Sequence, residues 1–375
     1  MTQPKRKPSP AKRTPKRQPT QGVPPLFRDL LTARGPSGYE TDPAGVWRAA
    51  AGKFAKVSTD IVGTPLALVA PARGGQRAAR RLLVMGHIDE IGVIVTHIDD
   101  EGFLWIREVG GWDPVILVGQ RLVIDTAKGP VRGVVGKKAV HLLREEERGK
   151  AVKINDLHLD IGAKDGEEAR KLVAIGDVAV IDAEPVELPN NRLTARALDN
   201  RVGSFVALEA ARLIAAAGGA KWEIAAVAAA QEETTFGGSR TSAFSLEPDA
   251  AVVIDVTHAT DTPGADFKEA GKHALGSGAV IARGSTLNNR VYELLVEAAE
   301  AEKIAYTVEA TGRATGTDAD AVHASRGGVP TAVVSIPLRY MHSPVELIQI
   351  DDVLAAARII AAMALRLKSD TSFAR

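Results

Sequence analysis

Trp222-Glu223-Ile224-Ala225-Ala226-Val227-Ala228-Ala229-Ala230-Gln231-Glu232-Glu233 is an apolar run that ends in two adjacent acids. The first nine residues are almost wholly apolar, a pattern that predicts a strand buried on both faces. We therefore expect the strand to deliver Glu232 and Glu233 to the rim of a hydrophobic core. Burying an ionised carboxylate without a partner costs several kcal/mol, so the pair predicts a positive charge nearby, either Arg or Lys side chains or metal ions.

Length and composition indicate an ordinary globular protein. The 375 residues are enough for a full core and for two domains, and the chain is 45% apolar and 25% charged. No run of about 18 apolar residues is present, and the N-terminus is charged where a signal peptide would be apolar, so we expect a cytoplasmic protein with no membrane contact. The absence of cysteine excludes disulfides and thiolate metal sites, so any metal must be held by His, Asp and Glu.

Residues 1–22 have the composition of a disordered tail. They carry seven basic residues, five prolines and no acid. Because the whole chain has a net charge of +1, removing those seven positive charges leaves a body of about −6. We interpret the tail as a solvated extension; contact with nucleic acid through it is the alternative that we do not favour.

Along the rest of the chain, two kinds of sequence pattern alternate. Residues 93–188 contain short, glycine-punctuated strands, which predict a small β-barrel or sandwich. Residues 23–92 and 189–375 alternate apolar strands with long helices, which predicts an α/β domain interrupted by the β-domain. The predicted elements of the α/β part are helices at 26–33, 44–54, 199–217, 289–303 and 351–367, and strands at 81–87, 222–230, 250–256, 305–310 and 330–337.

Metal-competent side chains recur where the apolar segments of the α/β domain begin or end. Open α/β sheets bind ligands at the carboxyl ends of their strands, so five such positions predict one site. The positions are His87 with Asp89, Asp199, Glu232 with Glu233, Asp255, and His342.

Each residue also has an ordinary interpretation. A lone His at a strand end, such as His87, is more often a hydrogen-bonded group than a ligand, and Asp199 is a plausible helix N-cap. Asp255 suits a turn cap, and the acid pair suits salt bridges with Arg201 or Arg240. Five coincidences at element ends are together less probable than a single site.

The chemistry of a dinuclear metal centre explains these residue types. Two divalent ions roughly 3.5–4 Å apart hold a bridging water, lower its pKa and stabilise the oxyanion that forms when it attacks a carbonyl. Such a centre needs a bridging carboxylate, a His and a carboxylate on each side, and a free carboxylate to accept the proton of the water. The sequence offers this inventory.

Six ordered motifs resemble those of the cytosolic dinuclear metallo-aminopeptidases of the glutamyl-aminopeptidase or tetrahedral (TET) type, metallopeptidase family 42, some of which carry the name endoglucanase. The resemblance covers nearly all of the chain after the tail. The motifs are residues 86–92 (GHIDEIG), 197–203 (ALDNRVG), 231–233 (QEE), 254–256 (IDV), 316–319 (GTDA) and 336–344 (IPLRYMHSP).

The resemblance implies a role for each site residue. His87 and Asp255 would bind one metal, Glu233 and His342 the other, and Asp199 would bridge the two. Glu232 would be the general base. Asp89 would orient the ring of His87, as carboxylates beside metal-bound histidines commonly do.

The resemblance also implies a mixed-sheet α/β/α metallopeptidase domain whose inserted β-barrel-like domain makes subunit contacts. The expected activity is removal of N-terminal residues from short peptides, with two zinc or cobalt ions per subunit, in a homo-oligomer such as a dodecamer. Two stretches, 234–239 and 315–318, depart from the family pattern beside the ligands and leave the preferred N-terminal residue open. The competing functions are a dinuclear metal amidase or deacylase on the same scaffold, and a binding protein with a vestigial site.

Overall fold

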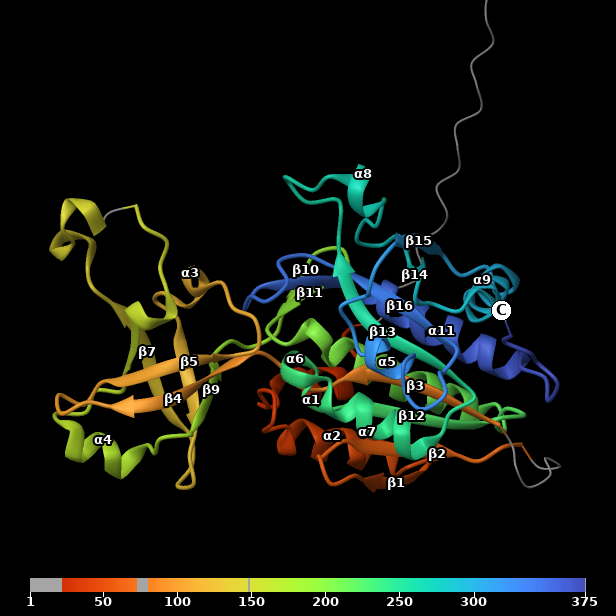
Figure 1. Cartoon of the computed structure of the whole chain (residues 1–375), viewed down its shortest axis with the longest axis horizontal. Helices are drawn as coiled ribbons and strands as arrows, with labels where there is room; N and C mark the ends of the chain where they lie inside the picture. The colour runs from red at the N-terminus through yellow and green to blue at the C-terminus, as the bar shows by residue number, and fades with distance from the viewer. Residues whose placement is uncertain (1–21, 73–79, 148, 375) are drawn as a thin grey trace, which may run out of the picture.

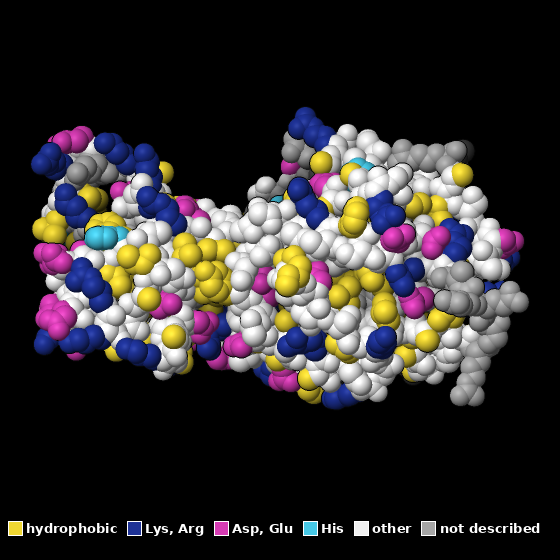
Figure 2. Space-filling model, turned by 60° about the horizontal axis from the view of Figure 1, so that its bottom comes forward, with side chains coloured by type: hydrophobic (Ala, Val, Ile, Leu, Met, Phe, Trp, Pro, Cys, Tyr) yellow, Lys and Arg dark blue, Asp and Glu magenta, His cyan; other side chains and the backbone are white. Residues whose placement is uncertain are grey.

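The computed structural model describes residues 22–72, 80–147 and 149–374, so the predicted tail at 1–22 lies almost entirely outside the described residues. An α/β body and a β-barrel make up the described chain, and the barrel projects to one side of the body (Figure 1). Charged side chains of both signs are interspersed over both lobes on the face drawn in Figure 2.

An eight-stranded mixed sheet forms the centre of the body, in the order β1-β2-β12-β3-β13-β16-β14-β15. Its four inner strands, β12, β3, β13 and β16, run parallel to one another. The strands of this sheet are β1 (Lys56–Thr59), β2 (Pro65–Val69), β3 (Arg81–His87), β12 (Glu223–Ala229), β13 (Ala250–His258), β14 (Ala279–Gly284), β15 (Tyr306–Thr311) and β16 (Thr331–Leu338).

Both faces of the sheet are buried, because its central strands are apolar at successive positions. In β3, Leu82 and Val84 pack into one core while Leu83 and Met85 pack into the other. The larger core is covered by α1 (Pro25–Thr32), α2 (Thr41–Ala51), α5 (Leu198–Ala216), α9 (Asn289–Ala301) and α11 (Ile350–Arg366). The smaller core is covered by α7 (Gly237–Leu246) and α10 (Ala319–Val322), and the body also contains the short helices α6 (Glu232–Thr235) and α8 (Phe267–Ala270).

The parallel strands bring the predicted site residues to one edge of the sheet. His87 is the last residue of β3, and β12 ends at Ala229, just before the acid pair. Asp255 lies on the neighbouring β13, and β16 ends at Leu338, four residues before His342. Because these strands are parallel, their carboxyl ends meet at the same edge.

The barrel is closed by six strands in the order β4-β5-β8-β7-β6-β9 and has its own apolar core. Its elements are β4 (Gly92–Ile98), β5 (Leu104–Val109), α3 (Pro114–Leu117), β6 (Arg121–Asp125), β7 (Val131–Lys137), three 3-10 turns (Val140–Leu142, Glu145–Glu147, Ile154–Asp156), β8 (Leu157–Asp160), α4 (Gly166–Leu172) and β9 (Val178–Ile181). The chain then returns to the body through a three-stranded sheet of β10 (Val186–Leu188), β11 (Arg192–Ala195) and β17 (Glu346–Gln349).

A buried charge cluster fastens the strand end of β3 to the N-terminal helix. Glu90 pairs with Arg201, with 2.9 Å between Oε1 and the guanidinium, and its other oxygen pairs with Arg196. Arg201 is fully buried and also donates to the backbone carbonyls of Leu30 and Ile88. Because every charge in this cluster has a partner, it fixes the start of the loop that carries Asp89 without leaving an isolated buried ion.

The predicted fold class, a mixed-sheet α/β/α body with a small barrel, is confirmed. Some predicted boundaries were wrong by a few residues. Helix α2 begins at Thr41 rather than at residue 44, because Pro43 in a first helical turn removes only an N–H that would have no intrahelical partner. Within the described residues, no helix has both the length and the apolar character needed to cross a bilayer.

Candidate metal centre

The carboxylate of Asp199 lies between two histidines. Its Oδ1 is 3.2 Å from Nε2 of His87, and its Oδ2 is 3.5 Å from Nε2 of His342. Asp199 comes at the start of α5, His87 ends β3, and His342 lies in the loop after β16. Three segments far apart in sequence therefore meet at one carboxylate, with one oxygen directed at each imidazole.

The acid pair extends this cluster on both sides. Gln231 has a left-handed backbone, with φ of 61°, which turns the chain sharply from β12 into α6. Glu232 Oε2 then lies 3.7 Å from His87 Nε2, and Glu233 Oε1 lies 3.5 Å from His342 Nε2. The two neighbouring acids thus face different histidines.

Among the residues that the structure describes, three groups of side chains place one donor atom each within 4.8 Å of one another. The groups are His87 with Asp199 and Asp255; Asp199 with Glu233 and His342; and His87 with Glu232 and Glu233. The first two reproduce the two ligand sets that the resemblance implies, and they share Asp199. The third includes Glu232, which the resemblance leaves unligated.

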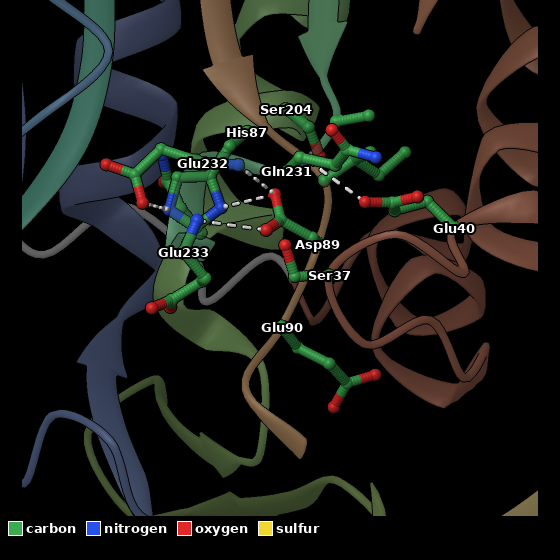
Figure 3. A network of polar contacts seen from close by, with 12 residues as sticks. Ser37, Glu40, His87, Asp89, Glu90, Ser204, Gln231, Glu232 and Glu233 are labelled. Carbon is green, nitrogen blue, oxygen red and sulfur yellow. Dashed lines mark hydrogen bonds and ion pairs between the residues drawn. The ribbon is translucent and has the colours of Figure 1, made fainter. Parts of the chain in front are cut away.

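Asp89 makes more contacts than the sequence predicted. Its Oδ1 lies 3.3 Å from Nδ1 of His87, the position expected for a carboxylate that orients the ring. The same carboxylate accepts the backbone amides of Glu232 and Glu233 at 3.1 and 3.0 Å. In Figure 3 dashed lines run from Asp89 to His87 and to the acid pair, and Glu90 lies apart from this group.

Two further buried carboxylates hold the backbone of the site, and the sequence analysis missed both. Glu40 accepts the amide of Gln231 at 3.0 Å (Figure 3). Glu346 accepts the amides of Asp199 and His342 at 3.0 and 2.9 Å. Glu40, at the start of α2, has no local sequence signal; Glu346 follows His342 by four residues and was the easier of the two to find.

Burial and the nearness of other carboxylates strongly raise the pKa values of three acids in the site. Burial, with repulsion from Asp255 and Asp318, raises the pKa of Glu232 to about 10, and burial next to Asp199 raises the pKa of Glu233 to about 8. Burial also raises the pKa of Asp255 well above its ordinary value. Without a cation in the cluster, Glu232 and Glu233 hold protons near neutral pH because burial and mutual repulsion disfavour their charged forms.

The pKa values of the two histidines and of Asp199 shift so that their charged forms are favoured. The hydrogen bond with Asp199 raises the pKa of His342 to about 9. Burial opposes a charged His87, but Glu232, Asp199 and Asp89 raise its pKa well above the ordinary value. For Asp199 burial is likewise outweighed: contact with both imidazoles lowers its pKa far below that of an ordinary aspartate.

The donor set fits divalent cations better than Arg or Lys. Tetrahedral ligands about 2.0–2.1 Å from an ion lie about 3.3 Å apart, close to the 3.2 and 3.5 Å between Asp199 and the two imidazoles. Of the two basic residues considered as ion-pair partners, Arg201 instead pairs with Glu90, and Arg240 is exposed. In the described part of the chain, no Arg or Lys forms an ion pair with Glu232 or Glu233. His, Asp and Glu are ligands suited to zinc and similar ions.

The barrel contributes one wall of the site through the loop after β5. A Cβ built on Gly110 would lie 3.3 Å from Oε2 of Glu233, and one on Gly111 would lie 3.4 Å from the ring of His342. The indole of Trp112 donates to the carbonyl of Gly92 at 2.8 Å. From the sequence we expected Gly110-Gly111-Trp112 to be a tight turn rather than a ligand-binding loop, although paired glycines also mark a close backbone approach. A hollow of about 10 Å³, close to the room that one water molecule needs, is lined by Trp112, Ile91, Ile181, Arg196, Asp199, Glu233, His342 and Pro344 among others.

The other histidines lie outside the cluster. His273 is buried and contacts Thr307, and His158 packs against Phe103 and Trp105 in the barrel. His97, His141 and His258 are exposed. His323, which follows the last residue of α10, contacts the carbonyl of Ala319. One further acid, Asp318, is buried within the electrostatic reach of Glu232, and burial raises its pKa to about 6.

Comparisons with known proteins show which family the chain resembles. Residues 67–359 match the family model described as M42 glutamyl aminopeptidase. The chain is 33% identical over 333 residues to the lysyl aminopeptidase of Pyrococcus furiosus, covering 88% of this chain and 92% of that protein.

Solved structures give the same picture. A TET aminopeptidase from a marine sediment archaeon of the Thaumarchaeota superimposes with a TM-score of 0.85 at 33% identity, over 91% of this chain and 96% of that one. The TET1 peptidase of Pyrococcus horikoshii, described as assembling into a tetrahedron or a large octahedral shell, superimposes with a TM-score of 0.79 at 29% identity, over 91% and 99% of the two chains.

Proposed function

Since this chain belongs to the M42 glutamyl aminopeptidase family, we propose that it is a metal-dependent aminopeptidase that removes N-terminal residues from short peptides. Membership of the family makes the chain a hydrolase of the aminopeptidase type. One observation carries the metal-dependent mechanism: Asp199 directs one oxygen at His87 and the other at His342. A carboxylate in this arrangement is suited to bridge two cations.

The proposed ligands follow the two donor groups that share Asp199. His87 and Asp255 would hold the first ion, Glu233 and His342 would hold the second, and Asp199 would contribute to both. Zinc or cobalt are the ions we propose, because imidazole and carboxylate are ligands that both accept. When bound, the ions polarise the scissile carbonyl and lower the pKa of the attacking water.

Glu232 moves the proton in this mechanism. Its carboxylate is only 10% exposed and faces His87 across 3.7 Å, so it lies at the edge of the ligand set. We propose that it accepts a proton from the attacking water and then donates it to the amine of the leaving peptide. Asp89 holds the amide of Glu232 and faces the ring of His87, so it aligns the base with a ligand without touching the substrate.

The TET1 peptidase of Pyrococcus horikoshii assembles into a tetrahedron or a large octahedral shell, which supports a homo-oligomer for this chain. We propose a dodecamer in which the barrel at residues 93–188 makes subunit contacts and the sites face an interior chamber. Such a chamber admits short or unfolded peptides and excludes folded proteins. A cytoplasmic location stays a prediction from the sequence.

The test is a screen of aminoacyl-anilide substrates with the purified protein after dialysis against zinc, cobalt or manganese. We expect release of aniline from free-amine substrates and none from N-acylated ones. Cleavage of N-acylated substrates alone would instead support an amidase or deacylase, and no metal-dependent hydrolysis would contradict the proposal.

Glu232→Gln tests the role of the base. We expect it to bind as much metal as the wild type, measured by elemental analysis, while kcat falls roughly 100- to 10,000-fold. Glu223→Gln is the matched control, because Glu223 lies at the opposite end of β12 and pairs with Arg81. Full activity in Glu232→Gln would remove Glu232 as the base.

A further inference from the structure

Glu346 binds two parts of the proposed centre with one side chain. Its Oε2 accepts the backbone amide of Asp199 at 3.0 Å, and its Oε1 accepts that of His342 at 2.9 Å. The residue begins β17 and is 2% exposed, so water does not compete for either hydrogen bond. Hydrogen bonds from backbone amides to a buried carboxylate are among the stronger ones in proteins.

We propose that Glu346 is a positioning residue that assembles the second metal site, formed by Asp199, Glu233 and His342, and that its loss weakens this site selectively. The inference rests on the proposed function, because it assumes that both donor groups bind metal. Glu346 itself reaches no substrate and acts only through the two backbones that it holds.

The backbone of His342 needs such a partner. His342 has φ of 58° and Tyr340 has φ of 62°, conformations that residues other than glycine rarely adopt. Backbone of this kind persists only when its surroundings fix it. The hydrogen bond from the His342 amide to Glu346 supplies that fixation, as the bond from the Gln231 amide to Glu40 does for the left-handed turn at Gln231.

The two metal sites differ in how their ligands are held. His87 and Asp255 lie within β3 and β13, where they pair with Ala229 and Ser335 in the parallel ladder. His342 lies in a loop outside the strands, and Asp199 lies at a kink where α5 departs from helical geometry. The sheet therefore holds two ligands of the first site without Glu346, while the second site depends on it for His342.

Asp352 offers a matched comparison. It is 1% exposed and accepts two backbone amides, those of Gly276 and Gly278 at 2.7 and 2.8 Å, but it touches no residue of the centre. Asp352→Asn removes the same kind of double hydrogen bond as Glu346→Gln. It therefore reports what losing such a bond does to stability alone.

The experiment is a titration of the metal-free wild type, Glu346→Gln and Asp352→Asn with Zn²⁺ against a chromophoric chelator, repeated with Co²⁺ by visible absorption. In Glu346→Gln one side-chain oxygen still accepts, but the amide NH₂ now faces the other N–H. We expect the second metal to bind roughly 10- to 100-fold more weakly, the first metal, which shares Asp199, to be weakened less, and the Co²⁺ spectrum of the second site to be altered. Excess metal should restore kcat at an unchanged KM, and Asp352→Asn should bind both metals like the wild type.

Equal affinity of both sites in Glu346→Gln and the wild type would overturn the inference, as would equal weakening of both sites. If Glu346→Gln does not fold, Glu346→Asp, which keeps the charge but withdraws the carboxylate by one methylene, is titrated instead, with the same two outcomes. A wild type that binds no metal pair would contradict the proposed function rather than the role of Glu346.

Discussion

Asp89 accepts the backbone amide of Glu233, with 3.0 Å between Oδ2 and the nitrogen. Its other oxygen accepts the amide of Glu232 at 3.1 Å and lies 3.3 Å from Nδ1 of His87. One carboxylate therefore faces the ring of a proposed ligand and holds the first turn of the helix that carries the proposed base. The position of the base relative to the first metal site depends on this single side chain.

Asp89→Asn should lower kcat more than it changes KM. The asparagine keeps one oxygen that accepts a hydrogen bond, but its NH₂ group cannot accept the second backbone amide, from Glu232 or Glu233. The two N–H groups repel, so the start of α6 moves relative to His87. We expect kcat to fall roughly 10- to 100-fold, the range typical of residues that orient metal ligands. Steady-state kinetics with an aminoacyl-anilide substrate measures both parameters.

Asp99→Asn is the control for this substitution. Asp99 lies in the barrel, away from the site, and accepts hydrogen bonds from the amide of Phe103 at 2.8 Å and from the indole of Trp105 at 3.1 Å. A kcat for Asp89→Asn equal to that of Asp99→Asn would show that Asp89 does not position the base.

The contacts of Asp89 illustrate how much of the site the sequence contains. The pairing of His87 with Asp89 was implied by the family resemblance, and it is chemically reasonable because a carboxylate two residues after a histidine can reach its ring. The contacts of Glu40 and Glu346 were not predicted. Glu40 lies 191 residues from its partner Gln231, and Glu346 lies 147 residues from Asp199, so only the folded sheet brings them together.

The fold was predicted most accurately where burial dominates. Apolar strands such as β3 and β12 were placed within a residue or two, because both of their faces must be covered. The edge strand β1 was missed, since Lys56–Thr59 is largely exposed and its pairing with β2 comes from backbone hydrogen bonds rather than from an apolar pattern. Strand β17 was missed too, because it is short and its partner β11 is distant in sequence.

The metal-free protein should lose stability as the pH rises. Burial raises the pKa of Glu233 to about 8 and of Glu232 to about 10, so the folded state binds protons that unfolded glutamates release above about pH 4.3. His342, whose pKa is raised to about 9, acts in the same direction. Asp199, whose pKa is lowered, has its full effect above about pH 4 and adds nothing in this window.

Thermal unfolding in EDTA measures this dependence. We expect Tm to fall by roughly 5–10 °C between about pH 5.5 and 8.5 in the chelated protein. Saturating zinc or cobalt should remove most of the fall, because the cations replace the protons as the positive charge in the cluster. A chelated protein whose Tm is constant or rises over this range would contradict the electrostatic account of the site.

The barrel loop after β5, which lies beside the site, supports a last prediction. Substitutions at its glycines separate the effect of a steric clash from the cost of a left-handed backbone. In Gly110→Ala the new methyl would lie 2.5 Å from Cγ2 of Ile91 and 3.3 Å from Oε2 of Glu233, at a φ of 78°. The loop must move, so we expect kcat/KM to fall at least about 10-fold and the second metal to bind more weakly.

Gly119 provides the matched control for this substitution. It has the same φ of 78°, yet nothing lies within 4 Å of an added Cβ, so Gly119→Ala carries the cost of the left-handed conformation, about 1 kcal/mol, without the clash. Gly111→Ala, whose methyl would lie 3.4 Å from the ring of His342, should be tolerated because that is an ordinary van der Waals distance. If Gly110→Ala and Gly119→Ala lose stability alike and both keep full activity, the barrel loop does not shape the site. If only Gly110→Ala loses activity and metal, the barrel takes part in the chemistry as well as in the architecture.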